Sequence, residues 1–266
     1  MKKIIYIAGL ARSGTTFLQL CLCQKYNVVG LGEIYQTIQG MQATAGEIDK
    51  KNWLDIGKRI CSCGLKPDRC DFWSEIYCQA KDYSLSGLHE MVIKKANENF
   101  SGIPVIDSSK EIKGIDLYRG SKEEYDLKVI LIVRDVRAWE RSIKKHAMKD
   151  GQKYYGQVIE YYRWMTANIN IESHLEKNNI KFLMVQNENL LFNSEAEWKR
   201  IDDFIGAEKS IGKLAMHDIY GSRFKNNENK SIDLKYDINW HQNNLDILSY
   251  LLSLPVLRKN SGFYNR

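Results

Sequence analysis

The chain has 266 residues, of which 44% are hydrophobic and 27% are charged, and its formal net charge is +6. This composition is typical of a soluble globular protein, and no stretch approaches the roughly 18 apolar residues of a membrane span, so we expect no membrane partner. The modest basic excess suits an anionic small ligand. The absence of a basic stripe interleaved with aromatic residues argues against nucleic acid as a partner.

The first predicted elements are a buried strand over residues 3–8 and an apolar helix over residues 15–26. The segment GLARSGTT between them is almost a phosphate-binding loop, whose pattern is Gly, four residues, then Gly-Lys-Ser/Thr. Thr15 stands where the lysine is expected. Glycines let backbone amides approach an anion, and the following helix directs its positive end toward it. We therefore expect an anion site in which Arg12 supplies the cation.

Lys2, Lys3 and the apolar run after them would pass as a minimal signal peptide. Arg12 cuts that run short, so we interpret it as a strand. Without a convincing export signal, the six cysteines are expected to be reduced and the protein to be cytoplasmic.

Four cysteines lie close together in the sequence, namely Cys61, Cys63, Cys70 and Cys78. They would offer four sulfurs to zinc, but CSCGLKPDRC contains C-x-C in place of the paired C-x-x-C knuckles typical of zinc sites. A compact turn with packed thiols is the favoured interpretation. A zinc site and disulfides stay open as alternatives.

Short apolar runs predict further strands. These are NVVGLGE ending at Glu33, IPVIDSSK ending at Lys110, residues 127–133, and IKFLMVQNENL from residue 180. Helices are predicted over 137–149, 154–177 and 195–205, and residues 34–100 are expected to be mainly helical. Apolar strands alternating with helices indicate an α/β fold with a central parallel sheet flanked by helices. We predict a single domain over 1–266, with a mainly helical, cysteine-containing insertion around 40–100.

Ligands of such folds bind beyond the carboxyl ends of the strands. Arg12, Glu33, Lys110 and Arg134 each follow a different predicted strand, so we expect them around one crevice.

Arg134 is followed eight residues later by Ser142, on the next predicted helix. A rigid guanidinium group and a hydroxyl suit a second phosphate. The alternative is an ordinary helix start capped by Asp135.

Three segments together resemble the PAPS-dependent sulfotransferase family: GLARSGTTFL, VIDSSK and ILIVRDVRAWERS. FLMVQNENLL and IDDFIG resemble its Y-E-x-L strand and F-L-G helix, with Gln186 in place of Tyr. HDIYGSRFK resembles the H-x-x-x-G-N-x-x-R segment that closes over the nucleotide, with Ser222 for Asn and Lys225 for Arg. The match is strongest to bacterial, tyrosylprotein and carbohydrate-type members, and it implies a P-loop-like sulfotransferase fold.

The resemblance implies 3′-phosphoadenosine 5′-phosphosulfate as co-substrate and adenosine 3′,5′-bisphosphate as product. The loop would hold the phosphosulfate, and Arg134 with Ser142 the 3′-phosphate. Neither a Walker lysine nor a metal is required. The nucleotide-binding residues implied are Arg12, Ser13, Gly14, Thr15, Thr16, Arg134, Ser142, Gly221, Ser222 and Lys225.

The implied reaction is in-line transfer of a sulfuryl group to an acceptor hydroxyl or amine. Charge builds on the leaving bisphosphate, where Lys110 and Arg12 are the candidate stabilising cations. Glu33 resembles the G-E of related members, whose Glu is the general base, and Asp107 is the reserve candidate.

Two other functions compete with this one. A metabolite kinase would need ATP and magnesium, and the missing lysine counts against it. A non-catalytic nucleotide-binding protein would be expected to lack Glu33 or Lys110, and both are present. The acceptor pocket is expected within residues 34–100 and 145–165, and its many aromatic residues suit a small molecule or a saccharide. Oligomeric state is not indicated.

Overall fold

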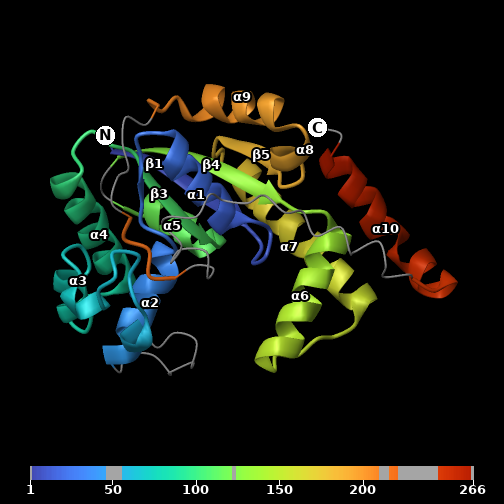
Figure 1. Ribbon diagram of the computed structural model, residues 1–266, viewed down its shortest axis with the longest axis horizontal. Coiled ribbons are helices and arrows are strands. Elements are labelled where there is room, and N and C mark those ends of the chain that lie inside the picture. The colour runs from blue at the N-terminus through green and yellow to red at the C-terminus, as the bar shows by residue number, and fades with distance from the viewer. Residues whose placement is uncertain (1, 46–55, 122–123, 210–215, 221–244, 265–266) are drawn as a thin grey trace. The chain divides into compact units, whose positions relative to one another are not determined.

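The computed structural model describes residues 2–45, 56–121, 124–209, 216–220 and 245–264. Within these ranges the chain forms a five-stranded parallel sheet in the order β2-β3-β1-β4-β5. The strands are β1 (Lys2–Gly9), β2 (Val29–Gly30), β3 (Val105–Lys110), β4 (Tyr125–Val133) and β5 (Phe182–Gln186). The predicted α/β class with flanking helices is therefore confirmed (Figure 1).

The helices of the described residues are α1 (Thr15–Lys25), α2 (Ile34–Ala45), α3 (Ser74–Cys78), α4 (Leu85–Asn99), α5 (Ile112–Arg119), α6 (Val136–Asp150), α7 (Gln157–Lys177), α8 (Asn189–Phe192), α9 (Ser194–Ile205) and α10 (Ile247–Tyr264). Short 3-10 turns cover Ile56–Lys58 and Pro67–Arg69. The predicted strand ending at Glu33 is too long, because only Val29–Gly30 pairs with β3. Helix α10 is not predicted from the sequence, and it contains Pro255, a residue that usually ends a helix.

The chain divides into two compact units. The first consists of Met1–Ala8, Thr16–Val129 and Ile205–Lys230, and the second of Gly9–Thr15, Ile130–Phe204 and Ser231–Arg266. The single domain with an insertion around 40–100 stays a prediction.

The core of the first unit forms around β3. Val105 lies opposite Ile4 of β1 and Val29 of β2, and all three side chains are buried. Such a row of buried apolar side chains across three neighbouring strands is typical of a parallel sheet with both faces covered. Helices α2, α3 and α4 gather into one helical cluster (Figure 1). Phe72 and Trp73, just before α3, are fully buried and meet edge to face.

The core of the second unit lies against α7. This helix packs on α6 and α10 (Figure 1). Its Trp164 is fully buried and meets Phe263 of α10 edge to face, with ring centroids 5.7 Å apart. None of the described helices combines the length and the apolar character that crossing a bilayer requires.

His89 of α4 is a buried histidine in the first unit. Its ring meets the ring of Tyr118 edge to face at 4.3 Å. Neither ring nitrogen has a hydrogen-bond partner among the described residues. Burial therefore disfavours the charged imidazolium and lowers the pKa of His89 to about 4.

This buried imidazole predicts a loss of stability in acid. The unfolded chain protonates His89 near its ordinary pKa of about 6.5, whereas the folded chain resists protonation down to about 4, so stability falls as the pH drops through that window. Between pH 7.5 and 4.5 the expected loss of stability is roughly 2–3 kcal/mol. Urea denaturation of the wild type and His89→Leu at both pH values measures it, and His146→Leu, on the surface of α6, is the control.

Candidate active site

The loop after β1 depends on two glycines with positive φ. A Cβ atom at Gly9 (φ 145°) would lie 2.5 Å from the carbonyl oxygen of Ile132 in β4. A Cβ atom at Gly14 (φ 98°) would collide with the side-chain amide of Asn187, just after β5. Glycine at both positions lets the loop pack closely against the ends of β4 and β5.

The structure brings Arg12, Arg134 and Ser142 together within the second unit. Arg12 Nε donates a hydrogen bond to Ser142 Oγ at 3.1 Å. Arg134 Nη1 donates to the carbonyl oxygen of Arg12 at 3.1 Å. The three residues come from the loop, the end of β4 and helix α6, so Arg12 and Arg134, two of the four residues expected around one crevice, lie together here.

Arg12 holds a left-handed backbone conformation, with φ at 71°. The Cβ atom makes that conformation unfavourable, and such strain of about 1–3 kcal/mol concentrates at functional sites. Lys110 has the same feature, with φ at 70°. These two residues are the cations that the sequence resemblance assigns to the leaving group.

Two buried tryptophans fix the backbone next to Arg12 and at Arg134. Trp139 Nε1 donates to the carbonyl oxygen of Ala11 at 2.9 Å, and Trp164 Nε1 donates to that of Arg134 at 3.1 Å. Neither role is predicted from the sequence, where Trp164 lies within residues 145–165, a range expected to contribute to the acceptor pocket. The apolar spacing of α7 was the available signal that Trp164 lies in the core.

The loop leaves donors available for an anion. Partial burial and the nearby charge of Arg134 lower the pKa of Arg12. Among the described residues, the buried Ser13 Oγ and Arg134 Nε have no hydrogen-bond partner. Helix α1 begins at the buried Thr15, with Thr16 as its second residue, so its amino end faces the same loop. Cations, unpaired donors and a helix start together suit a phosphate or sulfate group.

Asp135 also caps α6, as the alternative interpretation of this segment predicts. Its carboxylate accepts a hydrogen bond from the amide of Arg137 at 2.9 Å. Burial alone would raise the pKa of Asp135, but bonds from the Arg137 and Asn260 side chains lower it. The segment after β4 therefore provides both the cap of α6 and the contact between Arg134 and Arg12.

Glu33 and Lys110 form an ion pair within the first unit. Lys110 is the last residue of β3, and Glu33 immediately precedes α2. Their side chains are 13% and 16% exposed, respectively, so the pair is mostly shielded from water but accessible. The pair places a carboxylate, a side chain of the type that acts as a general base, directly beside an ammonium group.

A buried carboxylate positions this pair. Asp107 accepts hydrogen bonds from the amide and the hydroxyl of Ser109, from Tyr118 Oη at 2.9 Å, and from the amide of Ile34. Ser109 Oγ in turn accepts from the amide of Tyr35 at 2.9 Å. The end of β3 thus satisfies the first amides of α2, which would otherwise lack partners.

Asp107 is a weaker candidate for the base than Glu33. Burial raises its pKa to about 6, and both carboxylate oxygens already accept hydrogen bonds within the protein. Its place in the structure is that of an anchor for Glu33 and Lys110. The expected nucleotide-binding residues Gly221, Ser222 and Lys225 lie outside the described residues.

No family model matches the sequence, and the curated proteins contain no match. Solved structures do match. The sulfotransferase domain from the Synechococcus PCC 7002 olefin synthase is 16% identical with a TM-score of 0.61, and the alignment covers 98% of this chain and 96% of that one. The sulfotransferase domain from the curacin biosynthetic pathway is 14% identical with a TM-score of 0.58, covering 96% and 98%.

This chain has the sulfotransferase fold. The resemblance carried by the three sequence segments is thus confirmed as a fold, over nearly the full length of both chains. Because identity is low, the neighbours carry no information on individual site residues.

This sulfotransferase fold also contains a cluster of sulfur atoms that the sequence predicts only in part. Cys61, Cys63 and Cys70 gather as expected for a compact turn, but Cys78 is exposed and lies outside the group. The fourth member is His217, which in the sequence belongs to the segment expected to close over the nucleotide. All six cysteines are free thiols, so the disulfide alternative is wrong.

Proposed function

We propose that the protein is a sulfotransferase that moves a sulfuryl group from 3′-phosphoadenosine 5′-phosphosulfate to a hydroxyl or amine of a small molecule or saccharide. The observation that carries the proposal is the contact of Arg12 with both Arg134 and Ser142 on a lysine-free phosphate loop. The sequence resemblance independently assigns the same three residues as donor ligands. Cytoplasmic location and the absence of nucleic-acid and membrane partners belong to the same proposal.

The donor explains why the loop lacks a lysine. A phosphosulfate carries less negative charge than the triphosphate of ATP, so backbone amides, the start of α1 and one guanidinium group suffice to bind it. Arg134 and Ser142 would bind the 3′-phosphate. A kinase acting on ATP and magnesium is not favoured, because Thr15 replaces the lysine that reaches the terminal phosphates.

Transfer would proceed in line through a loose transition state, in which positioning and electrostatics supply the catalysis. The acceptor oxygen or nitrogen bonds to sulfur as the bond from sulfur to the bridging phosphate oxygen breaks. The electron pair of that bond stays on the bisphosphate, where Arg12 and Lys110 would stabilise it. Glu33, the ion-pair partner of Lys110, would take the acceptor proton.

Thermal unfolding with nucleotides tests the proposed donor site. Adenosine 3′,5′-bisphosphate at about a hundred times its Kd should add about 2.7 kcal/mol of stability and raise Tm by roughly 5–10 °C. ATP with magnesium should do much less. A rise with ATP and magnesium alone would replace the sulfotransferase proposal with the kinase.

Arg134→Ala should weaken bisphosphate binding by about 1.5–3 kcal/mol, roughly 10- to 150-fold in Kd, because a charged hydrogen bond to phosphate is lost. Isothermal titration calorimetry measures the change. Lys145→Ala removes an exposed charge from the helix that follows Arg134 and serves as the matched control. Equal affinities for the two variants would contradict the assignment of Arg134 to the 3′-phosphate.

Glu33→Gln should lower the rate of bisphosphate release from the sulfuryl donor by about 100-fold or more, with an acceptor selected from a panel of phenols and saccharides. The Kd for the bisphosphate should change little, since Gln keeps the shape but cannot take the proton. Glu98→Gln, an exposed carboxylate on α4, is the control. Near-normal turnover by Glu33→Gln would remove Glu33 from the role of base.

A further inference from the structure

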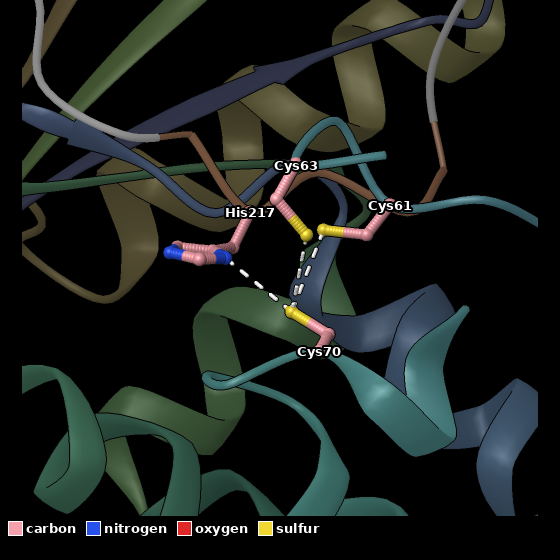
Figure 2. A group of neighbouring side chains, drawn as sticks. All are labelled: Cys61, Cys63, Cys70 and His217. Carbon is pink, nitrogen blue, oxygen red and sulfur yellow. Dashed lines mark hydrogen bonds between the residues drawn. The ribbon is translucent and has the colours of Figure 1, made fainter. Parts of the chain in front are cut away.

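Four side chains of types that commonly bind metals lie close together in the first unit. In the sequence they are far from the phosphate loop. The sulfur atoms of Cys61, Cys63 and Cys70 and the imidazole of His217 point toward one another (Figure 2). Their ligand atoms all lie within 4.8 Å of one another. Three come from the segment between α2 and α3, and the fourth lies about 150 residues further along the chain.

The three distances from Cys70 to the other members of the cluster are close to those of a tetrahedral zinc shell. Cys70 Sγ lies 3.6 Å from Cys63 Sγ, 3.7 Å from Cys61 Sγ and 3.4 Å from His217 Nδ1. Zinc bonds sulfur at about 2.3 Å and nitrogen at about 2.0 Å, so a tetrahedral site separates two sulfurs by about 3.8 Å and sulfur from nitrogen by about 3.5 Å. A disulfide would need about 2.05 Å between sulfurs.

The surroundings of the sulfurs suit thiolates bound to a metal. The backbone of Cys63 hydrogen-bonds to the sulfur of Cys61, and that of Leu65 to the sulfur of Cys63. The backbones of Phe72 and Trp73 do the same for Cys70. Hydrogen bonds of this kind orient metal ligands and stabilise their charge.

The two segments are also fixed in place around the ligands. Ser62, between two of the cysteines, donates its hydroxyl to the carbonyl of Met216 at 2.7 Å and accepts from the amide of Asp218 at 2.9 Å. Its own amide donates to the carbonyl of Asp218 at 2.8 Å. Trp73 Nε1 donates to the carbonyl of His217 at 2.6 Å, and Phe72 stacks on the His217 ring.

We propose that Cys61, Cys63, Cys70 and His217 bind one zinc ion that ties residues 216–220 to the turn before α3. Zinc fits because three thiolates and one imidazole form a soft, closed tetrahedral donor set with no position left for a substrate. The ion is structural and takes no part in sulfuryl transfer.

The zinc ion would also fix residues next to Glu33, which is part of the active site if the proposed function is correct. Asp218, next to His217, is buried, and its carboxylate contacts the backbone of Gly32, one residue before Glu33. Gln19 Nε2 of α1 donates to the same carboxylate at 3.3 Å. Binding of His217 and the cysteines to one ion would therefore hold Asp218 against Gly32, the residue before the proposed general base Glu33.

The metal content of the full-length protein tests the proposal directly. Protein purified without chelators and with a phosphine reductant should contain about one zinc per chain by plasma mass spectrometry. Cys78→Ala should keep the zinc, whereas His217→Ala should lose most of it. A strong chelator should lower the Tm of the wild type by about 5 °C or more, and zinc chloride should restore it.

Cobalt(II) chloride added to the zinc-free wild type gives a second readout that needs neither a variant nor the sulfuryl donor. Tetrahedral thiolate coordination should produce intense visible bands, and zinc chloride should abolish them. Zinc below about a tenth of an equivalent together with no cobalt bands would overturn the proposal, as would equal zinc content in His217→Ala and the wild type. If the protein binds zinc but not the bisphosphate, the proposed metal site stands and the proposed sulfotransferase function is wrong.

Discussion

The buried carboxylate of Asp107 is the group on which the arrangement of Glu33 and Lys110 in the first unit depends. It lies within β3 and accepts hydrogen bonds from Ser109, Tyr118 and the first amide of α2. A carboxylate is costly to bury, and only such a set of donors makes it tolerable. The same bonds fix the start of α2 relative to the end of β3. Glu33 and Lys110 then meet as a consequence of that junction.

In the second unit, the loop that carries Arg12 has a strained backbone that its surroundings hold in place. Arg12 adopts a left-handed conformation, and the glycines on either side of it allow the loop to approach β4 and Asn187. Tryptophan indoles donate to the carbonyls of Ala11 and Arg134, so the unfavourable geometry is over-determined by its surroundings. Lys110, the last residue of β3, has the same left-handed backbone conformation. Arg12 and Lys110 are the two cations proposed to stabilise the leaving group.

Sequence periodicity predicted β1, β3, β4 and most helices, because fully buried parallel strands are continuous apolar runs such as ILIV. Local spacing likewise identified Arg12, Arg134 and Ser142. It failed where the deciding contact is distant in sequence. His217 completes the cysteine cluster across about 150 residues, and no motif spans that gap. Helix α10 was missed because its interior contains Pro255, although it packs on α7.

The contact between Gly32 and Asp218 links two positions that are far apart in the sequence. Gly32 has φ at 71°, and a Cβ atom there would overlap the Asp218 carboxylate. A side chain at position 32 thus meets both an unfavourable backbone and an occupied space. Shortening residue 218 removes only the second obstacle. The effects of substitutions at these two positions on stability are therefore non-additive. A smaller residue at position 218 has to come first before a side chain at position 32 can be accommodated.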